Sequence, residues 1–241
     1  MGWFRDWLMA IRDVLLPRGC AGCDEPDAVL CGACSRLFSM DLVRPLPGII
    51  SGICLCCADY DAEARQAILA WKDHGDEECV GEFGRAMGDR LARWVVGDGR
   101  ALMESGHPAV ALVPVPSSLS SIRRRGRWHM EGLARVVGKR LRDSGIDAIV
   151  VPAISLDRRM RRSVEVGGRR GRARRMDGGV SLVEPQRDVL RRSARSGACV
   201  CVVDDIVTTG ETMRRCCRTL REAGVDVDVA MALARTPPPM P

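Results

Sequence analysis

The chain has 241 residues, of which 46% are hydrophobic and 28% charged, and its formal net charge is +6. This length allows one large core with a small appendage or two modest domains, and the composition is typical of a globular protein. No apolar run approaches the roughly 18 residues that a membrane helix needs, so we expect no insertion into a membrane.

The N-terminal segment 1–16 has apolar residues at helical spacing, with Asp6 and Asp13 among them. Acidic residues inside the apolar stretch argue against an export signal. The pattern predicts an amphipathic helix and a cytoplasmic protein.

The positive charge comes almost entirely from arginine, because Lys72 and Lys139 are the only lysines. Arginines gather at 123–127 and across 158–175. Their planar forks suit phosphate groups better than ammonium groups do. Two explanations stay open at this point: a general compositional preference for arginine, and a surface that binds phosphates.

Three Cys-x-x-Cys pairs lie near the N-terminus: Cys20 with Cys23, Cys31 with Cys34, and Cys54 with Cys57. Two such pairs a few residues apart can bring four thiolates to the corners of a tetrahedron, which is the geometry of structural zinc. The predicted ligands of a structural Zn²⁺ are Cys20, Cys23, Cys31 and Cys34. A disulfide scaffold and a thioredoxin-like redox pair are the alternatives, and neither export nor a surrounding βαβ pattern supports them.

The remaining cysteines carry a weaker signal. Cys54 and Cys57 form an unmatched pair, which is either a relic of a second site or a substitute ligand pair. Five others sit in apolar patterns and are expected in the core: Cys79, Cys199, Cys201, Cys216 and Cys217.

Three regions follow from the hydrophobic patterns. Residues 1–58 form an N-terminal helix and zinc module, and residues 59–108 form a helical connecting region packed on the core. Helices are expected at 59–76 and 82–96, each with one apolar stripe.

Residues 109–236 form the main domain, in which strands and helices alternate. The expected strands are 109–116, 147–154, 198–203 and 225–234, and the expected helices are 129–143 and 212–224. This alternation predicts an α/β fold whose mainly parallel sheet has flanking helices. Ligands of such sheets bind beyond the carboxyl ends of the strands. The Arg- and Gly-rich segment 157–179 has little to bury and is expected to be a lid, a binding loop or disorder.

Asp204 and Asp205 come where the strand 198–203 is expected to leave the sheet, and Thr208–Thr212 then turn into a helix. A helix start of this kind offers backbone N–H groups, hydroxyl groups and a glycine that allows close approach of a phosphate. Two carboxylates beside it suit the hydroxyl groups of a sugar phosphate. An ordinary Thr cap after a strand-end acid pair, and a metal site, are the alternatives.

The stretch "VVDDIVTTGET" (202–212) resembles the phosphoribosyl-pyrophosphate (PRPP) signature of type I phosphoribosyltransferases. The whole chain resembles the ComF family, including GntX-like proteins, which joins a cysteine-knuckle module to such a domain. The segment 59–76, with Tyr60 and Lys72, and the segment 112–130, with its Pro-Val-Pro run and Arg-Gly element, are similar to parts of that family.

The resemblance implies a type I phosphoribosyltransferase-like fold and a set of site residues. Asp204 and Asp205 would contact the ribose hydroxyls and serve as the catalytic pair. The 5'-phosphate would lie in the turn formed by Thr208, Thr209, Gly210, Glu211 and Thr212. Val115, Pro116, Ser117 and Arg125 would approach PRPP from the loop after the first strand. Mg²⁺ would accompany the pyrophosphate, and the Arg-rich segment would close over the site.

The sequence departs from the family at two places. The family commonly has Arg-Gly-Phe-Asn-Gln where this chain has Arg125-Gly-Arg-Trp-His129. The segment 157–179 lacks the family's Gln, and its Arg174–Asp177 matches an Arg-x-x-Asn element only approximately. These departures concern the acceptor rather than PRPP.

The implied activity is transfer of a phosphoribosyl group to an unidentified acceptor, most simply a nitrogen, with release of pyrophosphate. His129 is either a proton-transfer group or a capping or surface residue. The family's association with DNA uptake implies an alternative: a competence accessory protein that binds PRPP and single-stranded DNA, or acts with competence proteins, without catalysis. Few aromatic residues are available to stack on bases, and an inactive PRPP sensor is a third possibility.

Overall fold

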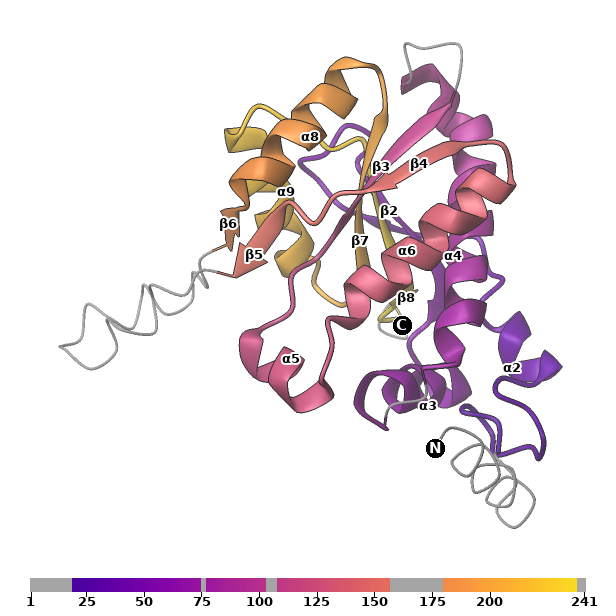
Figure 1. The fold of residues 1–241 in the computed structure, drawn as a ribbon. Helices are drawn as coiled ribbons and strands as arrows, with labels where there is room; N and C mark the ends of the chain where they lie inside the picture. The colour runs from indigo at the N-terminus through magenta and orange to yellow at the C-terminus, as the bar shows by residue number, and fades with distance from the viewer. Residues whose placement is uncertain (1–18, 75–76, 103–107, 157–179, 238–241) are drawn as a thin grey trace, which may run out of the picture.

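The computed structural model describes residues 19–74, 77–102, 108–156 and 180–237 (Figure 1). Its strands are β1 (Leu42–Pro45), β2 (Ile53–Asp59), β3 (Ala109–Pro114), β4 (Asp147–Val150), β5 (Ile154–Leu156), β6 (Val180–Leu182), β7 (Cys199–Val207) and β8 (Val229–Arg235). Its α-helices are α2 (Gly32–Arg36), α3 (Ala62–Leu69), α4 (Cys79–Val96), α5 (Leu119–Arg125), α6 (His129–Asp143), α8 (Glu184–Arg195) and α9 (Glu211–Glu222). A π-helix, η1 (Ala70–His74), continues α3, and a 3-10 helix, η2 (Asp98–Leu102), follows α4.

The main sheet has the order β1-β2-β8-β7-β3-β4. All neighbours from β2 to β4 run parallel, and β1 is antiparallel to β2. β5 and β6 form a separate antiparallel pair. The structure therefore confirms the predicted fold class, a mainly parallel α/β sheet with flanking helices and a small cysteine-rich module at its N-terminal side.

Helices cover both faces of the sheet (Figure 1). α3, α4 and α6 pack on one face, and α8 and α9 pack on the other. Side chains of a strand point alternately to the two faces, so on β7 Cys199, Cys201 and Val203 join the first core cluster, while Val200 and Val202 join the second. The strand is buried on both sides, which explains its continuous apolar run.

The predicted helix 129–143 coincides with α6, but the bounds of the four predicted strands differ from the structure: the strand expected at 109–116 ends at Pro114, and the one expected at 225–234 begins at Val229. The strand expected at 147–154 is divided into β4 and β5, with Pro152, which has no N–H to donate to a sheet, between them. The strand expected to end at residue 203 continues as β7 to Val207, because β8 pairs with it up to that point.

The interpretation of Cys54 and Cys57 as a substitute ligand pair is wrong, and nothing in the fold tests their interpretation as a relic. Both lie on β2, which pairs with β8 inside the main sheet, and both are buried. Cys54 belongs to one core cluster and Cys57 to the other, because an odd spacing along a strand places side chains on opposite faces. β1 and β2 thus belong to the main sheet, and the division at residue 58 stays a prediction.

The other five cysteines expected in the core are all buried there, which confirms that prediction. The predicted N-terminal helix within 1–16 and the segment 157–179 lie outside the described residues. Within the described ranges, no helix is long and apolar enough to cross a bilayer.

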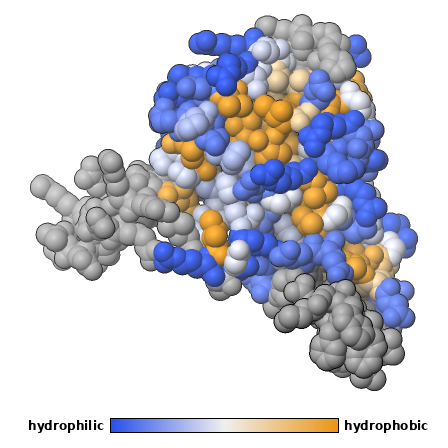
Figure 2. Space-filling view, in the orientation of Figure 1, coloured by the Kyte–Doolittle hydropathy of each residue, from blue (hydrophilic) through white to orange (hydrophobic). Residues whose placement is uncertain are grey.

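β1 and β4 form the two edges of the main sheet. Apolar surface lies over β4 and its neighbours in the view of Figure 2, and Ile149 on β4 is exposed. The polar cleft described next is formed instead by the ends of β3 and β7.

Candidate functional site

A cleft of about 430 Å³ opens where β3 ends beside β7. Seven of the residues predicted for the site line it: Val115, Pro116, Ser117, Asp204, Asp205, Thr208 and Thr212. The structure therefore brings the strand-end acid pair, the loop after β3 and the Thr-rich turn into one cavity. Five further lining residues were not predicted as site residues: Tyr60, Lys72, His129, Met130 and Ile206.

The position of the acid pair follows from the unequal lengths of the strands. β3 pairs with β7 only as far as Pro114 opposite Val203, whereas β8 accompanies β7 to its end. Asp204 and Asp205 are therefore the first residues of β7 that have no neighbour on the β3 side. As successive strand residues they face opposite sides of the sheet, and Asp205 faces the side covered by α3 and α6.

Asp205 is a buried carboxylate that is held from two directions. Its Oδ2 lies 2.8 Å from Lys72 Nζ and 2.8 Å from His129 Nε2. Burial alone raises its pKa, but the hydrogen bond from His129 and the charge of Lys72 outweigh burial and lower the pKa to about 2. Asp205 is thus ionised at neutral pH.

Asp204 has the opposite electrostatic character. Burial and the neighbouring charge of Asp205 raise its pKa to about 8, although its Oδ1 accepts a 2.9 Å hydrogen bond from the backbone N–H of Asp205. The pair therefore combines one carboxyl group with a lowered pKa and one with a raised pKa. Such a pair can both accept from and donate to the hydroxyl groups of a sugar.

The turn from Thr208 to Thr212 leads from β7 into α9. Gly210 caps the helix with φ of +78°, and a Cβ placed there would lie 2.9 Å from Leu46 Cδ1. Both the conformation and the space therefore favour glycine. The first N–H groups of α9 have no acceptor within the helix, which makes this turn suited to an anion.

The threonines of this turn face different ways, and Glu211 is turned outward. Thr208 and Thr212 line the cleft, while Thr209 lines a neighbouring groove together with Thr208. The carboxylate of Glu211 is exposed and pairs with Arg214 and Arg215 on α9. Glu211 therefore stabilises the helix start rather than lining the cleft.

Arg125, predicted to approach PRPP, is not among the residues that line the cleft. Its guanidinium donates to Asp73 Oδ1 at 3.1 Å and lies 3.3 Å from His129 Nδ1. Arg127 is likewise engaged, donating to the carbonyl of Trp71 and pairing with Glu77. These two arginines thus act within the fold, and the cluster 158–175 lies outside the described residues, so binding of single-stranded DNA stays a prediction.

His129, read from the sequence as either a proton-transfer group or a capping or surface residue, is buried rather than on the surface. It begins α6, as expected, but only 6% of it is exposed. Trp71 packs against its ring in a T-shaped arrangement, with 5.2 Å between centroids. Neither Lys72 nor His129 carries a local sequence pattern, but both lie in segments that resemble the ComF family, Lys72 in 59–76 and His129 in 112–130.

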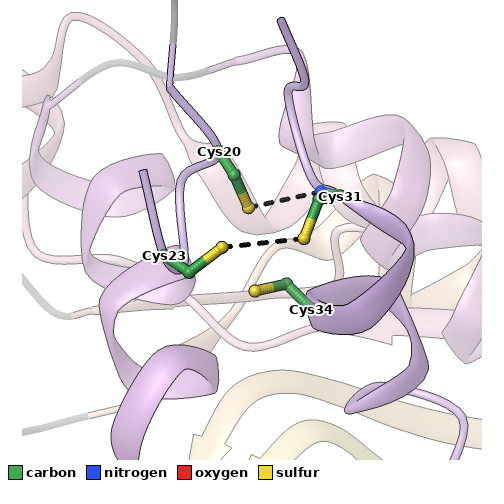
Figure 3. Close-up of side chains that lie close together, drawn as sticks. All are labelled: Cys20, Cys23, Cys31 and Cys34. Atoms are coloured by element: carbon green, nitrogen blue, oxygen red, sulfur yellow. Dashed lines mark hydrogen bonds between the residues drawn. The ribbon is translucent and has the colours of Figure 1, made fainter. Parts of the chain in front are cut away.

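The four predicted zinc ligands form one cluster, which Figure 3 shows with the side chains pointing toward one another. Their sulfur atoms all lie within 4.8 Å of one another, and none forms a disulfide. The two pairs come from the loop before α2 and from the start of that helix. Added to Gly22, a Cβ would lie 2.8 Å from Cys34 Sγ, so glycine is needed for this close approach.

The donor set fits a tetrahedral Zn²⁺. Zn–S bonds of about 2.3 Å imply sulfur–sulfur distances of about 3.8 Å, and Cys23 Sγ and Cys31 Sγ are 3.6 Å apart. Cys20 Sγ accepts a 3.2 Å hydrogen bond from the N–H of Cys31. Burial raises the pKa of Cys20, but several backbone N–H donors outweigh it and lower the pKa to about 7, which favours a thiolate. All four positions are taken by cysteine, so an ion here would have a structural role.

No protein-family model matches the chain, and no curated protein sequence matches it significantly. Among solved structures it is similar to hypoxanthine phosphoribosyltransferases from Trypanosoma cruzi. One, in a ternary substrates complex, has a TM-score of 0.36 and 16% identity over 65% of this chain and 66% of that chain. Another, in complex with the product IMP, has a TM-score of 0.37 and 16% identity over 68% of this chain and 73% of that chain. TM-scores below 0.5 carry no conclusion about activity, so a function has to be inferred from the cleft itself.

Proposed function

We propose that this protein binds PRPP as its Mg²⁺ complex and transfers the phosphoribosyl group to an acceptor, with release of pyrophosphate. The observation that carries this proposal is the cleft in which the Asp204–Asp205 pair lies beside a turn suited to phosphate. The same residues carry the sequence resemblance to ComF-type phosphoribosyltransferases.

Each part of PRPP has a counterpart in the cleft. The carboxyl groups of Asp204 and Asp205 meet the ribose hydroxyls, and the start of α9 with Thr208 and Thr212 meets the 5'-phosphate. The loop Val115–Ser117, next to the end of β3, meets the pyrophosphate. It has a fixed course, because the N–H of Val115 donates to Val203 at 2.9 Å and its carbonyl accepts from Trp128 Nε1 at 3.2 Å.

The reaction breaks the bond between C1 of the ribose and the pyrophosphate oxygen, and a bond forms between C1 and the acceptor. Positive charge develops on C1 while the leaving group takes the electron pair, and the Mg²⁺ that arrives with PRPP neutralises the leaving group. An N–H acceptor loses its proton to water or to pyrophosphate. The contribution of the chain is to position the two partners and to place the ionised Asp205 near the developing charge.

A screen of candidate acceptors tests the proposal and identifies the acceptor. Pyrophosphate release is measured with the zinc-loaded protein, Mg²⁺, PRPP and a panel of purines, pyrimidines and ammonium. Acceptor-dependent release by the wild type, but not by Asp205→Asn, is the expected result. If PRPP neither binds nor reacts with any member of the panel, the proposal is contradicted; binding without release supports the inactive sensor instead.

A further inference from the structure

Five side chains in and beside the cleft form a network of polar contacts. They are Lys72, Asp73, Arg125, His129 and Asp205. Arg125 contacts Asp73 at 3.1 Å and His129 Nδ1 at 3.3 Å, and His129 Nε2 lies 2.8 Å from Asp205 Oδ2. Lys72 Nζ lies 2.8 Å from the same Oδ2, and Asp73 is its neighbour in the chain. Both residues belong to the π-helix η1, an element that is often found at functional sites.

The contact with Arg125 fixes the tautomer of His129. An arginine side chain has donors only, so a hydrogen bond between Arg125 and His129 requires Nδ1 to be the acceptor. The proton of the neutral ring is then on Nε2, and this N–H donates to Asp205 Oδ2. Both ring nitrogens are engaged, which leaves none for a substrate proton.

The consequence for Asp205 is that one of its oxygens is already occupied. Lys72 and His129 both contact Oδ2 at 2.8 Å, from η1 and from the start of α6. Asp205 lines the cleft, and neither of these two donors contacts Oδ1, so Oδ1 is the oxygen that we assign to a ligand.

We propose that His129 is a positioning residue, which together with Lys72 orients Asp205 so that Oδ1 accepts a hydroxyl of the bound sugar. The identity of that ligand rests on the proposed function, whereas the orientation of Asp205 does not. Arg125 lies outside the cleft, but its contact with His129 helps to orient this side chain toward Asp205.

The tautomer is tested by NMR on the full-length, zinc-loaded protein without ligand. The chain has three histidines, so replacing His74 and His107 by glutamine leaves His129 as the only labelled imidazole. Nitrogen chemical shifts of ¹⁵N-histidine distinguish the two tautomers. A single species protonated at Nε2 is expected at neutral pH, and a ring protonated at Nδ1, or a mixture of tautomers, would overturn the proposal.

Affinity for Mg·PRPP, measured by calorimetry, tests the orientation of Asp205. His129→Phe keeps a ring but removes the donor, and is expected to weaken binding about tenfold, the usual effect of losing a hydrogen bond to a charged group. His129→Gln restores a donor to Asp205 and is expected to recover most of this loss. Equal losses of affinity in both variants would overturn the proposal. If His129→Phe does not fold, the tautomer of His129 in the wild type, measured by NMR, decides the question.

Failure of this inference and failure of the proposed function give different results. A ring protonated at Nε2 in a protein that binds no Mg·PRPP would support the orientation of Asp205 and contradict the proposed function. A protein that binds Mg·PRPP while His129 carries its proton on Nδ1 would contradict only the inference about His129.

Discussion

Lys72 and Asp205 form an ion pair of 2.8 Å that joins the π-helix η1 to the end of β7. This contact makes the helical region 59–108, expected from the sequence as a connection packed on the core, part of the cleft itself. The side chain of Lys72 is 17% exposed and that of Asp205 is 10% exposed, so water screens the pair only weakly.

Removing this lysine is expected to destabilise the fold. In Lys72→Met, His129 is the one cationic or donor side chain of the described residues that still contacts the buried carboxylate of Asp205. We expect the free energy of unfolding to fall by about 1–3 kcal/mol, the cost of leaving a buried polar group short of a hydrogen bond, because His129 still contacts the carboxylate. Urea unfolding followed by circular dichroism measures the change.

The other lysine of the chain provides a matched control. Lys139 pairs with Asp143 one turn away on α6, and its side chain is 71% exposed. Lys139→Met is therefore expected to change the free energy of unfolding by no more than about 0.5 kcal/mol. Equal effects of the two substitutions would contradict a special role for the Lys72–Asp205 pair.

The two carboxyl groups are expected to change stability in different pH ranges and with opposite sign. The pKa of Asp205 is lowered to about 2, so its contribution is present above about pH 4 and is lost as the pH falls toward 2. The pKa of Asp204 is raised to about 8, so the native protein holds an extra proton between about pH 4 and 8. Stability therefore falls as the pH rises through that second range.

Asparagine substitutions separate these two effects. Asp204→Asn is expected to flatten the decline in stability toward pH 8, because an amide does not ionise. Asp205→Asn is expected to lower stability at pH 7, because Lys72 and His129 lose their anionic partner. Urea unfolding at a series of pH values measures both, and a decline in Asp204→Asn as steep as in the wild type would argue against the raised pKa.

The cysteine cluster is expected to hold about one Zn²⁺ per chain. Cys20→Ser removes a ligand and is expected to lower both the zinc content and the thermal midpoint, whereas Cys54→Ala changes a core residue and leaves zinc bound. Metal analysis of the purified variants measures this difference. Loss of zinc from Cys54→Ala equal to that from Cys20→Ser would show that the third cysteine pair takes part in metal binding.

Gly210→Ala tests the turn that is proposed to hold phosphate. A left-handed backbone costs an alanine roughly 1 kcal/mol, and here the new Cβ also lies 2.9 Å from Leu46. Gly145 has the same φ of +78° with nothing within 4 Å of its Cβ, so Gly145→Ala carries the conformational cost alone. We expect greater destabilisation and weaker PRPP binding for Gly210→Ala, and equal behaviour of the two variants would contradict a constrained turn.

The sequence was most informative where the signal is local. Alternating apolar strands and amphipathic helices after residue 109 predicted the parallel sheet, and the spacing of Cys20 to Cys34 predicted the cluster that the structure brings together. The acid pair and the turn after it were also recognisable, because all of these residues are close together in the chain.

What the sequence did not predict depends on contacts between distant segments. The pair Cys54–Cys57 had the spacing of a metal knuckle, and its place in the core depends on the pairing of β2 with β8. Lys72 and His129 act on Asp205 only because η1, α6 and β7 converge in the folded chain. A single lysine or histidine gives no periodic pattern from which such a role can be inferred.

The central claim is tested most directly by calorimetric titration of Mg·PRPP into the folded, zinc-loaded protein. One molecule of PRPP per chain is expected to bind in a saturable manner, with binding lost in Asp205→Asn and retained in the Lys139→Met control. Absence of binding to the wild type, or equal binding to wild type and Asp205→Asn, would contradict the assignment of this cleft to PRPP.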